Sequence, residues 1–282
     1  SVLSHQLRRK DLAIPQFISV GGGSMGAGFL GAKYNPFVVN SDGRIRNLDM
    51  KVDQRFYQRA YALDAIENNF INQRRGSLAK EHQAILKETF SVLTSAQMDA
   101  LKVASEPENI KERYGDNNFG KGCLMARRLV EAGVPFIEVN LGGWDNHQNI
   151  FPTLRDTKLP MLDQGMSALY EDLEQRGLLQ DTAIIWMGEF SRTPRINGNA
   201  GRDHWARSWS VVVGGAGMNG GIAIGETNSD GTRVETEPHS SQDVMASVCK
   251  ALGISLGTTF TSNSGRPMKI ANSGKVITEL FG

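Results

Sequence analysis

Acidic and histidine side chains gather in three short stretches of the second half of the sequence. The first, at 142–147, contains an Asp and a His, the second, at 188–192, contains a Glu, and the third, at 201–205, contains an Asp-His pair. Carboxylate oxygens and imidazole nitrogens are donors that divalent metals take in proteins. These stretches therefore predict a metal site, and its candidate ligands are Asp145, His147, Glu189, Asp203 and His204.

Each candidate also has an ordinary structural interpretation. An Asp after a strand is often a helix cap or a turn residue, and a single His such as His147 is often a surface group. Glu189 could form an ion pair with Arg192, and Asp203 with His204 could be a polar turn. Their grouping favours a site, because ligands bind beyond the carboxyl ends of strands in open parallel sheets.

The elements that must position these residues follow an α/β pattern. Apolar runs predict strands at 136–140, 183–187 and 210–213. A helix from about residue 153 to Gly177 joins the first two strands, and one face of it carries Leu162, Met166, Leu169 and Leu173. A strand, a long helix and a strand predict a βαβ unit with a parallel sheet. Further helices are expected before Gly133 and over 243–252.

The first half of the sequence carries weaker signals. A strand at 14–20 ends in glycines, and residues 21–26 match G-x-G-x-x-G. A dinucleotide fingerprint should open a helix, whereas residues 29–39 contain Gly, Asn and Pro and favour a loop over a site. Apolar residues at helical spacing predict a helical insertion over 48–115, which carries no functional signal.

The overall composition excludes some classes of partner. The 282 residues include 31 basic and 30 acidic side chains, for a net charge of +1, so the sequence predicts neither nucleic-acid nor membrane-surface binding. Arginine pairs such as Arg127-Arg128 are expected on solvated helix faces. Cys123 and Cys249 lie in apolar contexts that favour buried thiols over a disulfide. No apolar run approaches the roughly 20 residues of a membrane-spanning helix.

Three motifs carry a resemblance to a known family. They are GGWDNH at 142–147, MGEFSRTPRIN at 187–197 and GRDHW at 201–205. In this order they resemble the family called domain of unknown function 1501, and the likeness extends from Gly21 to 265–267. That family is usually placed in the alkaline phosphatase-like superfamily, with sulfatases, phosphatases and cofactor-independent phosphoglycerate mutases. The resemblance implies one such domain over 1–282, a three-layer αβα sandwich with a mainly parallel sheet and the helical insertion.

The same resemblance implies roles for the candidate residues. Asp145 and His147 correspond in order to the first pair of metal ligands, and His204 resembles the last His. Glu189 stands where the superfamily usually has the Asp of a second pair, and Phe190 replaces the usual His. One ligand is therefore lost or supplied elsewhere, for which Asp203 is the candidate. The implied cofactors are divalent ions of zinc, calcium, magnesium or manganese.

One expected segment is missing from the N-terminal side. Family members usually have an upstream strand that ends in a Gly-Gly-x-Ser-His-x-Asp-like stretch, and the superfamily places its nucleophile and a first metal-binding Asp in that region. The chain begins at Ser1 without such a stretch. We therefore expect a truncated domain whose catalytic nucleophile is unknown and for which the missing segment is a candidate partner. Ser24, in the glycine loop, is disfavoured as a nucleophile.

These observations lead to two functional hypotheses. The first is a hydrolase of small-molecule or glycan phosphate or sulfate esters, in which metals polarise the ester oxygen. Arg192 and Arg202 would bind the anion by forked hydrogen bonds, although both could instead pair with neighbouring acids. The second is a non-catalytic binding or structural protein, which the missing segment and Phe190 favour. Export signals common in the family imply a periplasmic or secreted protein.

Overall fold

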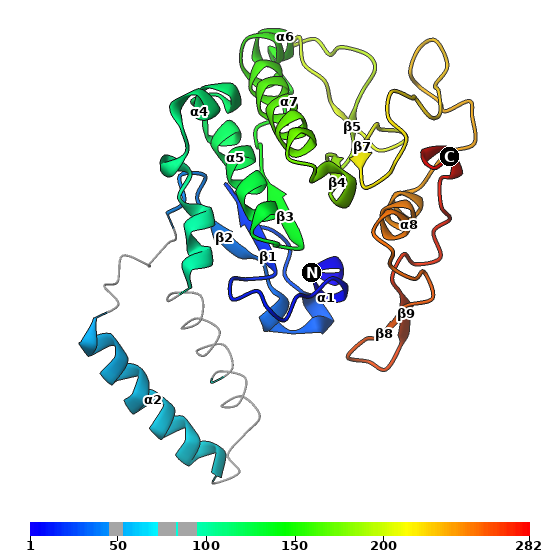
Figure 1. The fold of residues 1–282 in the computed structure, drawn as a ribbon. Helices are drawn as coiled ribbons and strands as arrows, with labels where there is room; N and C mark the ends of the chain where they lie inside the picture. Colours follow the sequence, from blue (N-terminus) through cyan, green and yellow to red (C-terminus); the bar gives the residue numbers. More distant parts are fainter. Residues whose placement is uncertain (45–52, 73–82, 84–94) are drawn as a thin grey trace. The chain divides into compact units, whose positions relative to one another are not determined.

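The chain divides into two compact units, Ser1–Asn140 and Leu141–Gly282 (Figure 1). The computed structural model describes residues 1–44, 53–72, 83 and 95–282. Helices and strands occur in both units, which confirms the mixed α/β class. None of the described helices has the length and apolar character needed to cross a membrane.

The first unit is built on a parallel sheet of order β2-β1-β3. Its strands are β1 (Phe17–Val20), β2 (Phe37–Val39) and β3 (Phe136–Val139). Ile18 of β1 is opposite Phe37 on one side and Ile137 on the other. β1 and β3 confirm two predicted strands, whereas β2 occupies a stretch that was expected to be a loop. Val39 explains the difference, because its side chain is 1% exposed and packs in the core.

Helix α5 (Asn118–Glu131) packs on this sheet and leads into β3. The Asn117 side chain caps its start by accepting a hydrogen bond from the Gly120 N–H at 2.9 Å. A Cβ on Gly122 would lie 2.9 Å from Val139 Cγ1, so glycine lets the helix approach β3 closely. The other helical elements among the described residues of this unit are α1 (Val2–Gln6), η1 (Gly28–Leu30), η2 (Ala32–Tyr34), α2 (Gln54–Asn72), η3 (Ala96–Leu101), η4 (Val103–Ser105) and α4 (Glu108–Tyr114).

The predicted helical insertion at 48–115 falls partly outside the described residues. Its described parts are helical and comprise α2, η3, η4 and α4. Residues 45–52, 73–82 and 84–94 are not described. The insertion as a whole therefore stays a prediction.

The expectation that the arginine pairs lie on solvated faces is wrong for Arg127. Its side chain is 2% exposed, and its guanidinium binds Glu106 at 2.7 Å and Glu131 at 2.6 Å. Arg128 also binds Glu106 and donates a hydrogen bond to the Ala100 carbonyl at 3.0 Å. Sequence alone gave no sign of this cluster, because Glu106 lies outside α5 and reaches the arginines only in the folded unit. Arg44 is exposed beside Asp42, as expected, but it lies outside the described helices.

The second unit begins with a loop and one long helical segment. α6 (Ile150–Thr153) passes through a π-helical turn, η5 (Leu154–Lys158), into α7 (Leu159–Gln175). Leu162, Leu169 and Leu173 are buried on one face, as predicted. Gly177, with φ +69°, ends the helix at the expected place. A short η6 (Leu179–Asp181) then leads into β4 (Ala183–Trp186).

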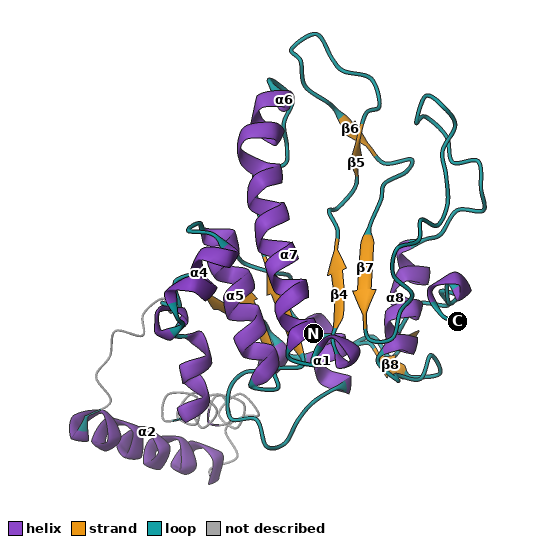
Figure 2. Cartoon of the chain, turned by 45° about the horizontal axis from the view of Figure 1, so that its top comes forward, coloured by secondary structure: helices purple, strands orange, loops and turns teal. Residues whose placement is uncertain are grey.

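Strands of the second unit pair antiparallel (Figure 2). β4 pairs with β7 (Val212–Gly215), and β5 (Ser191–Arg192) pairs with β6 (His204–Trp205). β7 confirms the strand predicted near 210–213, and its antiparallel pairing with β4 departs from the mainly parallel sheet that the family resemblance implies. Parallel neighbours need a crossover, usually a helix, whereas the chain between β4 and β7 contains only the β5–β6 hairpin. β3 and β4 belong to different sheets of the described chain, so the predicted crossover between them stays a prediction.

A last group of elements completes the second unit. α8 (Ser241–Ala251) starts at a capping box in which the Asp243 N–H donates to the Ser240 side chain and Asp243 accepts from the Ser240 N–H. β8 (Thr259–Thr261) pairs with β9 (Pro267–Lys269), and η7 (Thr278–Leu280) follows. Met218, Ile277 and Leu280 form a buried cluster. Cys123 in α5 and Cys249 in α8 are buried free thiols, as predicted.

Candidate metal centre

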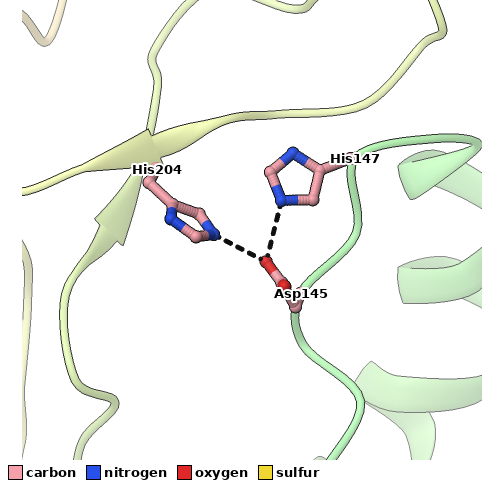
Figure 3. Close-up of side chains that lie close together, drawn as sticks. All are labelled: Asp145, His147 and His204. Atoms are coloured by element: carbon pink, nitrogen blue, oxygen red, sulfur yellow. Dashed lines mark hydrogen bonds and ion pairs between the residues drawn. The ribbon is translucent and has the colours of Figure 1, made fainter.

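Asp145, His147 and His204 form the candidate site, and all three belong to the second unit (Figure 3). Asp145 Oδ1 lies 3.0 Å from Nε2 of His147 and 3.0 Å from Nε2 of His204. One ligand-type atom from each residue lies within 4.8 Å of the others. The two imidazole rings are 5.0 Å apart between centroids. Three donors from two separated stretches therefore converge on one small region.

Two chain segments bring these donors together. Asp145 and His147 lie in the loop before α6, whereas His204 lies in β6, opposite Arg192 of β5. Between β5 and β6, the loop at 193–203 is held against this first loop by backbone hydrogen bonds. The Arg202 N–H donates to the Asn146 carbonyl at 3.1 Å, and the Ile150 N–H donates to the Ala200 carbonyl at 2.9 Å. The site is thus positioned by backbone contacts as well as by its side chains.

Arg192 supplies the positive charge beside the site. Its guanidinium binds Asp145 and reaches Glu189 at 3.5 Å, while the side chain is 16% exposed. The guanidinium carbon also lies 5.4 Å from the ring centre of Phe190. Hydrogen bonds from His204 and Arg192 hold the pKa of Asp145 below its ordinary value, so this carboxylate stays ionised.

His147 has a second carboxylate on its other side. Its Nδ1 lies 3.0 Å from Asp203 Oδ1. This hydrogen bond raises the pKa of His147 above its ordinary value; burial opposes the shift, and the charges of Asp145 and Asp203 add to it. The pKa of Asp203 is lowered, first by His147 and then by the amide of Asn197.

A protein-family model matches almost the entire chain. The family model described as Protein of unknown function (DUF1501) matches residues 1–281. The chain belongs to the DUF1501 family. No curated protein and no solved structure matches it. Because the family description names no activity, the function of this DUF1501 protein has to be argued from its own residues.

The donor set of the DUF1501 site fits a divalent transition metal. Two imidazole nitrogens and one carboxylate oxygen are the three protein ligands typical of a catalytic zinc site, which leaves a position open. The same ligand types also suit non-haem iron. Calcium and magnesium prefer shells of oxygen ligands. Of the four metals expected from the sequence, zinc therefore fits Asp145, His147 and His204 best.

The other predicted site residues take different places in this DUF1501 chain. Asp203 contacts His147 from the side away from Asp145. The carboxylate of Glu189 is 65% exposed and lies outside the group of three ligand-type residues. Arg202 donates to the backbone carbonyls of Thr193 at 2.5 Å and Pro194 at 2.7 Å, so its guanidinium holds the 193–203 loop.

Sequence reasoning missed Asn197, whose side chain connects the two loops. Its amide nitrogen donates to the His147 carbonyl and to Asp203 Oδ1, both at 3.1 Å. Its amide oxygen accepts from the N–H groups of Asn199 and Gly201. The only signal in the sequence was an Asn followed by Gly, which is typical of an ordinary turn.

Proposed function

We propose that this DUF1501 protein is a metal-dependent hydrolase of phosphate or sulfate esters. The observation that carries the proposal is the convergence of Asp145, His147 and His204, whose ligand-type atoms lie within 4.8 Å of one another. Arg192 beside them adds a planar donor group that suits phosphate and sulfate oxygens. The site therefore combines a binding position for a cation with a binding position for an anionic group.

Each of these residues has a definite task in the proposal. Asp145, His147 and His204 would hold the ion, and Arg192 would orient the anionic group through its N–H donors. A bound divalent ion supplies a Lewis acid that neutralises charge on the ester oxygens. Arg202 supports the site by holding the loop that carries Asp203, since its guanidinium is taken up by backbone carbonyls.

The alkaline phosphatase-like fold and the cellular location are part of the same proposal. The family resemblance supports a three-layer αβα sandwich and a periplasmic or secreted protein that acts on small-molecule or glycan esters. The parallel sheet of β1, β2 and β3 is compatible with that fold class. Sulfate or phosphate esters outside the cytoplasm would then be the substrates.

A second candidate function rests on Phe190. This residue follows Glu189, where the superfamily usually has a metal-binding His, and its ring lies 4.8 Å from the ring of His204. An aromatic ring packs against His204 but offers no ligand atom. A binding or structural protein that retains the fold without turnover would have this feature.

Metal analysis and hydrolysis assays test the proposal together. Purified protein should contain close to one zinc, manganese or iron ion per chain, and His204→Ala should lose it because one of three ligands is removed. His239→Ala is the matched control, since His239 is an exposed histidine outside the ligand group. Metal-loaded protein should hydrolyse p-nitrophenyl phosphate or p-nitrophenyl sulfate.

The outcomes separate the two candidate functions. Equal metal content in the wild type and His204→Ala would remove the proposed metal site. Metal binding without hydrolysis of either ester would favour the binding protein over the enzyme.

A further inference from the structure

His147 lies between two carboxylates, and only one of them belongs to the group of ligand-type residues. Its Nε2 lies 3.0 Å from Asp145 Oδ1, and its Nδ1 lies 3.0 Å from Asp203 Oδ1. A carboxylate can only accept a hydrogen bond when it is ionised. In the metal-free molecule each ring nitrogen therefore faces a group that can accept its proton, and once Nε2 binds a metal the remaining proton lies on Nδ1, where it is shared with Asp203.

Asp203 is itself held in place by Asn197. The Asn197 amide nitrogen donates to Asp203 Oδ1 and to the backbone carbonyl of His147, so one side chain fixes both partners. The amide oxygen is occupied by the N–H groups of Asn199 and Gly201 at 2.9 and 3.0 Å. With all of its donors and acceptors used, this amide has one defined orientation.

We propose that Asp203 and Asn197 are positioning residues that fix the tautomer and orientation of His147, so that its Nε2 is presented as a metal ligand. This inference rests on the proposed metal site and deepens it. It assigns Asp203 a role beside a ligand instead of the ligand role that the sequence favoured.

The chemistry of a metal-binding His paired with a carboxylate explains why the position of Asp203 matters. A ligating His almost always donates its other ring N–H to a carboxylate, a carbonyl or water, which fixes the tautomer and makes the ligating nitrogen more basic. With the proton on Nδ1, the neutral ring has its lone pair on Nε2. That atom faces Asp145 Oδ1, within the group that also contains His204 Nε2.

Titration of Co²⁺ into metal-depleted protein tests the assignment. Asp203→Ala should bind Co²⁺ roughly 10–100-fold more weakly than the wild type, because outer partners of a ligating His typically contribute that much. Asp203→Asn should fall between them, since its amide oxygen still accepts a hydrogen bond but carries no charge. At saturation, the visible absorption spectrum of both variants should match the wild type, because the ligands are unchanged.

Control variants make these results specific. Asp230→Ala removes an exposed aspartate outside the ligand group and should bind Co²⁺ like the wild type. His147→Ala removes a ligand and should change the saturated spectrum. Wild-type affinity in Asp203→Ala would overturn the positioning role, and a spectrum altered as in His147→Ala would make Asp203 a ligand.

A second measurement works without any metal. Long-range ¹H–¹⁵N NMR of ¹⁵N-histidine-labelled protein at about pH 9, above the ordinary pKa of His, should show His147 with its proton on Nδ1. In Asp203→Ala the proton should move to Nε2, which still faces the carboxylate of Asp145. A wild-type protein that binds no Co²⁺ but shows the Nδ1–H tautomer would defeat the proposed function alone. An Nε2–H tautomer in the wild type would defeat the positioning role.

Discussion

Asp145 Oδ1 contacts three nitrogen groups at once: Nε2 of His147, Nε2 of His204 and the guanidinium of Arg192. In the metal-free molecule Arg192 supplies the positive charge beside this ionised carboxylate. A metal ion would take over the contacts from the two imidazoles and share the carboxylate with Arg192. Arg192 and the metal are therefore competitors for Asp145, even though both favour an anionic substrate.

Arg192→Gln should separate these two effects. Removing a positive charge beside the site should tighten Co²⁺ or Zn²⁺ binding about fivefold, because charges a few ångströms apart near a protein surface interact by about 1 kcal/mol or more. The same change should weaken inhibition by inorganic phosphate, since the forked donor is lost. Arg195→Gln is the control, because Arg195 is exposed and lies in the neighbouring loop. Weaker metal binding in Arg192→Gln would show that Arg192 orients Asp145 instead of competing for it.

Metal affinity should also rise with pH. The pKa of His147 is raised, chiefly by its hydrogen bond to Asp203, so the ring keeps its second proton to higher pH than an ordinary His. A metal must displace that proton from Nε2. Binding should therefore tighten from about pH 6 to pH 8 and level off once the ring is neutral. Calorimetric titrations in two buffers would show the released proton, and an affinity independent of pH would contradict this picture.

At the scale of elements, the 193–203 loop decides whether the ligands meet. Gly201 is buried against the first loop, and a Cβ on it would lie 2.0 Å from the backbone carbon of His147 and 2.4 Å from the Gln148 nitrogen. Backbone cannot yield to such a contact as a flexible side chain can. Glycine at this position therefore permits the close approach that sets His204 beside His147.

Gly201→Ala should weaken metal binding roughly tenfold or more, because sites tolerate displacements of only about 0.5 Å. The loop would have to move away from His147 and carry Asp203 and His204 with it. Gly198→Ala is a matched control in the same loop, since nothing lies within 4 Å of its added Cβ. That control should keep wild-type affinity. Wild-type affinity in both variants would show that the loop contact does not position the ligands.

At the scale of the whole molecule, the sequence predicted chain-local features well and pairings between distant segments poorly. The strands at Phe17–Val20, Phe136–Val139 and Ala183–Trp186 and the ends of α7 and α8 follow from apolar runs and stop glycines. Asp145, His147 and His204 could be nominated because their types suit metals and their motifs resemble one family. The antiparallel return of β7 and the amide of Asn197 could not, since both depend on which segments meet after folding.

The charge cluster of the first unit shows the same limit on sequence-based prediction and provides a test of stability. Arg127 is 2% exposed between Glu106 and Glu131, and Glu106 is 9% exposed. Burial works against ionisation of Glu106, but hydrogen bonds from Arg127 and Arg128 outweigh it and lower the pKa of Glu106 below 4.5. Removing one partner of a buried pair leaves a charge that is poorly compensated.

Arg127→Met should lower the free energy of unfolding by about 3 kcal/mol, the lower end for a broken buried pair, because Arg128 still contacts Glu106. Arg155→Met, which breaks the exposed pair with Asp156, should leave the unfolding midpoint unchanged.

A carboxyl with a lowered pKa stabilises the fold above its unfolded-state pKa and loses that contribution as pH falls through its folded-state value. The stability difference between the wild type and Arg127→Met should therefore be full at neutral pH and shrink below about pH 4. Urea unfolding at several pH values measures this stability difference.

Because Asp145, His147 and His204 all belong to the second unit, folded Arg127→Met should bind metal like the wild type. An equal midpoint for both variants would show that the buried cluster contributes no net stability, and a loss of metal binding in the folded protein would show that the two units are energetically coupled.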